Sequence, residues 1–218
     1  MLLVDNRWEF QDANWFPDFA ASAEKMAWFY EQGRRATVDG VIAINASVLE
    51  RILTVLGPVQ NEKYNMELSS GDALGKIQQY VEEDYDHEEY QPKQILEDLA
   101  VELLGRAKDI NTMSAVRLVS ELSDAFTQKE VQIYLRNDEA EMQKLREFGW
   151  TGEIAKNSSA QDYLMIVNAN IGGLKTDAKI DQTIEHQAVI QEDGSVLDTV
   201  VIVRVNNGIA DEKFYGGN

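Results

Sequence analysis

The segment that most constrains the fold is residues 38–59, where an apolar run leads into an amphipathic one. Four β-branched apolar residues open it: Val38, Val41, Ile42 and Ile44. Such a run is typical of a strand covered on both faces. Ser47 and Glu50 then have the spacing of a helix capping box, and apolar residues recur at helical spacing up to Gly57 and Pro58, which end a helix. The segment predicts a strand–helix unit and an α/β layer.

Composition restricts the partners of the chain. Its 218 residues fit one large domain, or one domain with a small appendage. A net charge of −18 disfavours nucleic acid and anionic membrane surfaces. The lack of cysteine excludes disulfides, zinc–thiolate sites and a cysteine nucleophile. No apolar run approaches the ~20 residues that a membrane span needs, and Met1–Val4 does not resemble a signal peptide. We therefore expect any export signal or anchor to lie outside this chain.

The periodicity of the apolar residues divides the chain into two predicted regions. Residues 1–150 alternate helical and strand patterns and are predicted to form an α/β domain that is incomplete at its N-terminus. Residues 151–218 are predicted to form a β-rich element. Its strands are predicted at residues 163–167, 180–190 and 197–205, and Asp193-Gly194 predicts an antiparallel hairpin between the last two. The helix ends are predicted from Asp18, Ser69 with Asp72, Pro92 and Asn137.

The candidate binding residues cluster before the first predicted helix. Residues 12–19 place Asp12, Asn14 and Asp18 beside Trp15 and two phenylalanines. Carboxylates and an amide among aromatic rings suit the rim of a pocket that recognises polar ligands such as sugars. The simpler interpretation is a helix cap with aromatic side chains that anchor a loop.

Other polar groups give weaker indications of chemistry. The acidic run at residues 82–90 could bind a divalent cation, but it lacks the order of a calcium loop, and a solvated connection explains it more simply. The glycine-rich residues 170–176 lack the arrangement of a phosphate loop, because Leu174 separates the glycines from Lys175. His186 is predicted to be a hydrogen-bonded structural residue. No catalytic residue and no metal ligand is assigned.

Four segments resemble a bacterial family known as domain of unknown function 4012. They are Asp12-Ala13-Asn14-Trp15 with Pro17-Asp18, Asp39-Gly40-Val41-Ile42-Ala43-Ile44, Gly57-Pro58-Val59, and Asp162-Tyr163-Leu164 through Asn168-Ala169-Asn170-Ile171-Gly172-Gly173. Members of that family usually carry an N-terminal membrane anchor. The resemblance thus implies an extracytoplasmic location in the cell envelope and a longer, membrane-anchored protein, with no membrane contact by this portion itself.

A second similarity is to the LytR-CpsA-Psr transferases of cell-wall glycopolymers. It rests on Leu68, Gly71, Ala73 and Leu74, then Asp86, and Lys93-Gln94 opening a helix. In that family arginines bind a lipid pyrophosphate, whereas here Gln78 and Tyr90 stand at two such positions and Lys93 alone keeps a charge. This similarity implies a sheet flanked by helices whose chemistry has been lost, because pyrophosphate recognition needs bidentate cations.

Three functions are compatible with these patterns. The first is non-catalytic binding or scaffolding in surface-polymer assembly, with a cell-wall or surface glycopolymer as partner and Asp12, Asn14, Trp15, Asp18, Asp39 and Lys93 as candidate ligand-binding residues. The second is a metal-assisted phosphotransferase in which Asp12, Asp18 and Asp39 converge on an ion. The third is a purely structural part of a larger protein.

Overall fold

The computed structural model describes residues 8–80, 94–154, 163–169 and 176–208. These residues fall into two compact units, one within Arg7–Val167 and one that begins at Asn168. The first unit combines α-helices with small antiparallel sheets, and the second contains an antiparallel hairpin, so the predicted mixed α+β class is confirmed. This division assigns Thr151 to the first unit, whereas the sequence pattern places the change of character there.

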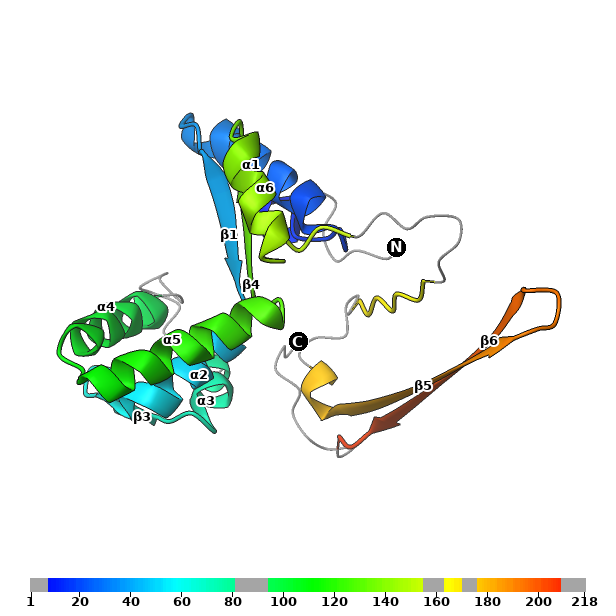
Figure 1. Ribbon diagram of the computed structural model, residues 1–218. Helices are drawn as coiled ribbons and strands as arrows, with labels where there is room; N and C mark the ends of the chain where they lie inside the picture. The colour runs from blue at the N-terminus through cyan, green and yellow to red at the C-terminus, as the bar shows by residue number, and fades with distance from the viewer. Residues whose placement is uncertain (1–7, 81–93, 155–162, 170–175, 209–218) are drawn as a thin grey trace. The chain divides into compact units, whose positions relative to one another are not determined.

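One part of the first unit is built on a two-stranded ladder. Strand β1 (Gly40–Ile44) pairs antiparallel with β4 (Val131–Leu135), with Ile42 opposite Ile133. Helix α1 (Phe19–Arg34), preceded by the 3₁₀ turn η1 (Phe10–Asp12), contacts both strands, and α6 (Glu139–Glu147) contacts β4 (Figure 1). The prediction of a strand covered on both faces is wrong, because Ile42 and Ile44 are 61% and 65% exposed. Among the described residues, the face that carries Ile42 and Ile44 is covered only at its end, where Val131 opposite Ile44 is buried against helices of the other part of this unit.

The other part of the first unit is helical. It contains α2 (Ser47–Leu56), α3 (Ala73–Gln79), α4 (Gln94–Lys108) and α5 (Thr112–Thr127), with a short hairpin of β2 (Val59–Asn61) and β3 (Met66–Leu68). The largest core cluster joins these elements through Leu53, Val59, Leu68, Ala73, Ile77, Ile95, Leu99 and Leu103. A smaller cluster of Val48, Ala125 and Val131 connects α2 and α5 to β4. The buried residues of α4, Ile95, Leu99 and Leu103, recur at helical spacing and form its core face.

The helix ends agree only in part with the sequence signals. Asp18 caps α1, and Gly57 ends α2 with a positive φ of 79°. The capping role predicted for Ser47 is wrong: Ser47 is already helical, and its amide donates to Oδ1 of Asn45 at 3.2 Å. At α6 the cap is Asp138, because Asn137 adopts a left-handed conformation.

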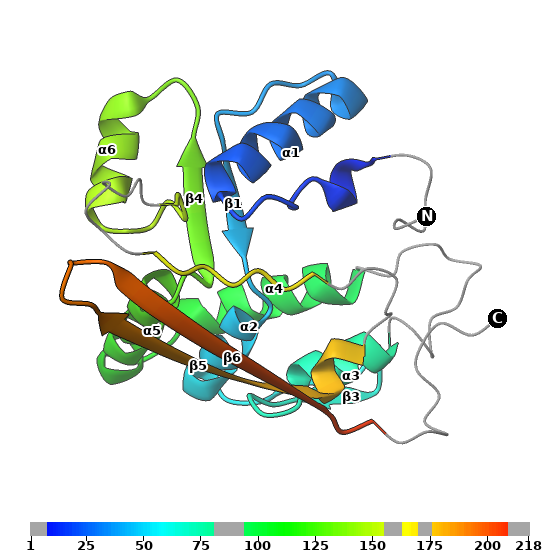
Figure 2. The ribbon, with the colours of Figure 1, turned by 90° about the vertical axis from the view of Figure 1, so that its right-hand side faces the viewer.

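The second unit is a long hairpin. After the 3₁₀ turn η3 (Thr176–Lys179), strand β5 (Ile180–Ile190) pairs with β6 (Val196–Asn206) along its whole length, from Ile180 opposite Asn206 to Ile190 opposite Val196 (Figure 2). Gly194 supplies the positive φ of the turn, as predicted. The strand predicted at residues 163–167 is wrong, since these residues pair with no strand in the part of the chain that the structure describes.

Each sheet formed by the described residues has two strands. The larger sheet flanked by helices that the LytR-CpsA-Psr similarity implies is thus not found among them. No helix within the described ranges is long and apolar enough to cross a membrane.

Candidate functional site: an aromatic surface on α1

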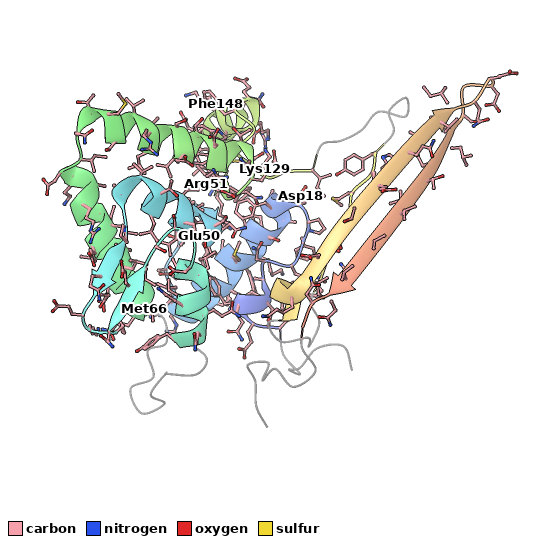
Figure 3. All side chains as sticks on the ribbon, turned by 90° about the horizontal axis from the view of Figure 1, so that it is seen from below. Asp18, Glu50, Arg51, Met66, Lys129 and Phe148 are labelled. Carbon is pink, nitrogen blue, oxygen red and sulfur yellow. The ribbon has the colours of Figure 1, made fainter. Side chains whose placement is uncertain are left out.

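The chain that leads into α1 is held by a buried serine. The Ser22 hydroxyl donates to the carbonyl oxygen of Phe16 at 3.0 Å and accepts the amide of the same residue at 3.0 Å. Ser22 itself has no exposed surface. Asp18 adds a second anchor, because Oδ1 accepts the amide of Ala20 at 2.9 Å and Oδ2 accepts the amide of Ile154 at 3.3 Å (Figure 3). The backbone of the loop is therefore fixed from two sides.

Large aromatic side chains of the chain before α1 and of α1 itself are open to solvent. Each of them is between 41% and 51% exposed, and together they form what we call the aromatic surface: Trp8, Phe10, Trp15, Phe16, Trp28 and Tyr30. Edge-to-face contacts connect Trp8 to Phe16 at 6.2 Å and, through the half-buried Phe29, to Trp28. Exposed aromatic groups that support one another are typical of an interaction site.

The ammonium group of Lys25 lies over two of the indoles. Nζ of Lys25 is 5.0 Å from the ring centroid of Trp8 and 5.1 Å from that of Trp28. Both distances lie within the range of cation–π attraction. The ammonium group therefore helps to hold the two rings in place and gives the surface one positive charge.

The structure brings four of the predicted site residues into this region. Asp12 ends η1, where Oδ2 accepts the amide of Glu9 at 3.1 Å and the carbonyl oxygen accepts the indole N–H of Trp8 at 3.1 Å. Asn14 and Trp15 are exposed next to it, and Asp18 caps α1. The carboxylates of Asp12 and Asp18 thus have structural partners, which agrees with the simpler interpretation of residues 12–19 as a helix cap with anchoring aromatics.

The remaining predicted residues are not part of this surface. Asp39 is exposed before β1, and its carbonyl oxygen accepts the amide of Arg136 at 2.7 Å. Lys93 lies outside the described residues. Among the residues that the structure does describe, no three histidine, aspartate or glutamate side chains are close enough to hold a metal ion. Asp12, Asp18 and Asp39 therefore do not converge as the metal-assisted mechanism requires.

Residues 4–81 match the family described as Protein of unknown function (DUF4012). The resemblance seen in the sequence is confirmed over this DUF4012 segment. No curated protein and no solved structure matches the chain. The similarity to the LytR-CpsA-Psr transferases is not shown by these comparisons.

The DUF4012 segment contains the whole aromatic surface. It runs from the chain before η1 through α1, β1 and α2 to α3. The sequence patterns missed Trp8, Lys25 and Trp28 as members of the surface, because the contacts between η1 and α1 are tertiary. Lys25, Trp28 and Phe29 are spaced three and four residues apart, so they lie on one face of a helix. This spacing is the sequence signal that could have identified Lys25 and Trp28.

The perturbed ionisable groups lie elsewhere and have structural roles. Arg51 on α2 reaches Glu130 at 2.5 Å and Glu121 at 3.2 Å, and its guanidinium lowers the pKa of Glu130 (Figure 3). Lys63 lies 2.7 Å from Asp98 and lowers the pKa of that carboxyl. Both sets of ion pairs link elements of the helical part, and this structural role is sufficient to explain the perturbed pKa values.

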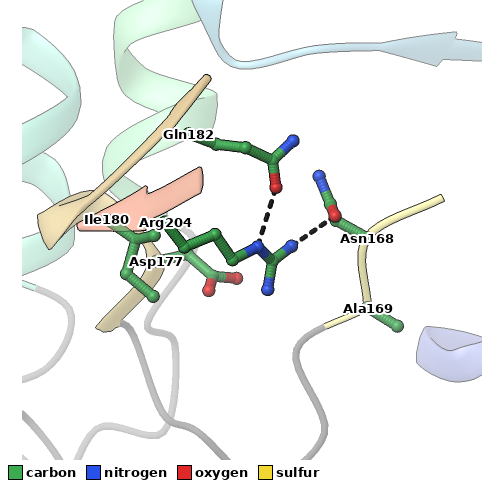
Figure 4. A pocket seen from close by; sticks show the side chains of 6 residues that line it. All are labelled: Asn168, Ala169, Asp177, Ile180, Gln182 and Arg204. Carbon is green, nitrogen blue, oxygen red and sulfur yellow. Dashed lines mark hydrogen bonds between the residues drawn. The ribbon is translucent and has the colours of Figure 1, made fainter. Parts of the chain in front are cut away.

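A small polar hollow lies at the base of the second unit. It is lined by Asn168, Ala169, Asp177, Ile180, Gln182 and Arg204 (Figure 4). The guanidinium of Arg204 donates to Oε1 of Gln182 at 2.8 Å and also to Oδ1 of Asn168. Arg204 thereby links Asn168 to the hairpin, and these hydrogen bonds account for the polar lining of the hollow.

Proposed function

We propose that this chain is an extracytoplasmic cell-envelope domain that binds or scaffolds a carbohydrate polymer during surface assembly, without catalysis of its own. The observation that carries the proposal is the aromatic surface on α1. Its rings are about half exposed, yet ring contacts, Lys25 and the anchored backbone hold them in place. A rigid aromatic group binds with little loss of conformational entropy.

Sugar recognition fits the chemistry of these residues. The C–H face of a sugar ring packs on an aromatic face, while hydroxyl groups need hydrogen-bonding partners beside it. The exposed amide of Asn14 lies next to Trp15 in the chain and can serve as such a partner. A net charge of −18 favours a neutral glycan over a polyanionic one, because a polyanion would be repelled.

The envelope location is supported by the DUF4012 match, and the lack of cysteine is compatible with it without distinguishing an exported protein from a cytosolic one. Fractionation of cells that carry the native protein tests this part of the proposal. We expect the protein in the envelope fraction. Recovery in the cytosol would contradict it without affecting a sugar-binding role.

Tryptophan fluorescence tests the binding site. Trp150 is stacked between Phe126 and Phe148, with ring centroids 4.3 Å and 5.0 Å away, so its emission would mask a surface signal. In a Trp150→Phe variant of the full chain, the tryptophan fluorescence comes from Trp8, Trp15 and Trp28 alone. Titration with neutral cell-wall glycan fragments should shift their emission and saturate.

Two substitutions then locate the site. Trp28→Ala removes an indole next to Lys25 and should weaken glycan binding about tenfold or more, as the loss of a central aromatic contact does. Phe148→Ala is the matched control, because Phe148 is 66% exposed but outside the aromatic surface (Figure 3). Equal affinities for the two variants, or no saturable signal with any neutral glycan, would refute the proposed site.

A further inference from the structure

The composition of β6 is that of a central strand, although in the part of the chain that the structure describes β6 lies at the edge of its sheet. Apolar side chains project from both faces of β6 and are between 38% and 60% exposed: Val196, Leu197, Val200, Val201, Ile202, Val203 and Val205. A strand that is apolar on both faces is normally flanked by neighbours. β5, by contrast, carries Asp181, Gln182, Glu185 and Gln187, as suits a true edge.

A hairpin of this kind is not expected to be stable alone. A two-stranded hairpin is marginal in water, and at least three strands or a covering layer are needed for independent stability. Among the described residues, β6 pairs with β5 only. The free edge of β6 is therefore the place where another strand would complete the sheet.

The hydrogen-bond phase of the hairpin shows which backbone groups face that free edge. The amide of Gln191 donates to the carbonyl oxygen of Ser195, and the amide of Asn207 donates to that of Lys179, both at 2.8 Å. Bonded pairs alternate with non-bonded pairs in an antiparallel ladder, so odd-numbered residues of β6 bond to β5. The amides and carbonyls of its even-numbered residues then point outward: Val196, Asp198, Val200, Ile202, Arg204 and Asn206.

The two charged residues of β6 are placed symmetrically in this outward set. Asp198 and Arg204 each lie three positions from Val201, and they are the charged side chains of the strand. If two copies of β6 pair antiparallel about Val201, Asp198 of each copy stands opposite Arg204 of the other. The same register places Val196 opposite Asn206 and Val200 opposite Ile202. Shifting it by one hydrogen-bond repeat would place both charges opposite other, mostly apolar, residues.

We propose that two copies of this chain associate through their β6 edges into a four-stranded sheet in the order β5–β6–β6–β5. Only even-numbered residues exchange backbone hydrogen bonds across the new interface, which matches the phase that the hairpin leaves free. Opposite charges that face each other on neighbouring strands stabilise that register. The contact is isologous and closed, because the outer edges of the product are the polar β5 strands.

The pairing leaves the existing contacts of both charged residues in place. Oδ1 of Asp198 is hydrogen-bonded to Nε2 of His186 at 2.9 Å, so the second carboxylate oxygen of Asp198 stays available. Arg204 uses Nε and one terminal nitrogen for Gln182 and Asn168, which leaves the other terminal nitrogen. Asn168 contacts Arg204 through its side chain, and none of the backbone hydrogen bonds found in the described ranges joins Asn168 or Ala169 to β6.

Sedimentation of the full chain at about 0.15 M salt, where the net charge is screened, tests the proposal. The wild-type chain should show a concentration-dependent dimer. Asp198→Arg places two arginines opposite each other at both ends of the interface, and Arg204→Asp does the same with aspartates. Each variant alone should weaken the dimer about tenfold or more. Glu185→Arg changes the same charge on β5 and should leave the dimer intact.

The decisive experiment mixes the two charge variants. Asp198→Arg paired with Arg204→Asp restores both opposite-charge contacts, so a labelled mixture should form a heterodimer with nearly wild-type affinity. If the mixture stays monomeric while the wild type dimerises, the charges act only within the hairpin, and the proposed register is wrong.

A backbone variant gives an independent test. Val200→Pro removes an amide that faces the free edge and leaves the β5 hydrogen bonds in place, so it should abolish the dimer. A wild-type chain that is monomeric up to millimolar concentration, or one that forms open-ended aggregates, overturns the proposal. A dimer that survives Val200→Pro and both charge variants would use another surface and overturn it as well.

Discussion

Replacing Ser22 with alanine should loosen the loop that carries part of the aromatic surface. The hydroxyl is buried and makes two hydrogen bonds to the backbone of one residue, Phe16. Alanine leaves that amide and that carbonyl without their protein partner at a partly buried position. The helix itself loses nothing, because alanine is the best helix former. The change thus isolates the connection between α1 and its preceding loop.

The magnitude follows from the two lost bonds. At about 1 kcal/mol net for each hydrogen bond, the loss is about 2 kcal/mol of unfolding free energy. For a chain of this size each kcal/mol shifts the melting temperature by roughly 2–4 °C, so a drop of about 4–8 °C is expected. The loop also positions Trp15 and Phe16, so glycan affinity should fall together with stability.

Thermal and urea unfolding followed by far-UV circular dichroism measure this effect, since all six described α-helices belong to the first unit. Ser123→Ala is the matched control, because Ser123 is exposed on α5 and its substitution should change stability by less than about 0.5 kcal/mol. If Ser22→Ala is no more destabilising than Ser123→Ala, the buried hydroxyl does not hold the loop, and the reasoning fails.

Three further predictions concern the first unit. Gly40→Ala should destabilise it by roughly 1–3 kcal/mol in urea unfolding, because the added Cβ would lie 2.4 Å from the carbonyl oxygen of Tyr134; Gly75→Ala, with nothing within 4 Å, should not destabilise it. Lys76, and then Ser69, lower the pKa of Asp72 to about 2, so its stabilising contribution is present above pH ~4 and is lost as pH falls toward 2. Asp72→Asn should flatten that part of a stability–pH profile, and an unchanged acid limb would contradict the assignment. Burial, followed by the hydrogen bond to Glu24, raises the pKa of Tyr134 to about 12. Because the neutral phenol is favoured in the folded state, its contribution persists below pH ~10 and is lost as pH rises through 12. Tyr134→Phe should remove this alkaline step, as spectrophotometric titration of the phenol can check.

Local signals in the sequence predicted most of the elements. Asp18 lies at the start of α1 because its carboxylate accepts amides of the first turn, and Gly57 ends α2 because glycine tolerates a positive φ. The hairpin of β5 and β6 follows from an Asp193-Gly194 turn between alternating runs. Each of these features depends on residues within a few positions of one another, which a single sequence displays.

Features that depend on distant contacts were not predictable in this way. Ile42 and Ile44 have the composition of a buried strand, but their environment is decided by which elements cover the ladder. The apolar residues 163–167 pair with no strand among the described residues, and composition alone cannot predict whether a strand has a neighbour. At the candidate site the sequence found Trp15 and its polar neighbours, whereas Trp8 and Trp28 join the surface only because η1 folds back on α1.

The two proposals together make a prediction that neither makes alone. A dimer joined at β6 carries two aromatic surfaces, so a polymer long enough to reach both should bind more tightly than a short oligosaccharide that reaches one. Such bivalence raises affinity by about 10²–10⁴-fold without any new contact. Asp198→Arg should therefore weaken binding to the long polymer and leave binding to the short fragment unchanged, while Trp28→Ala should weaken both. Binding measured against fragments of increasing length would show the difference. If Asp198→Arg weakens the shortest fragment as much as the polymer, the residue acts on the sugar site itself, and the two surfaces are not coupled through dimerisation.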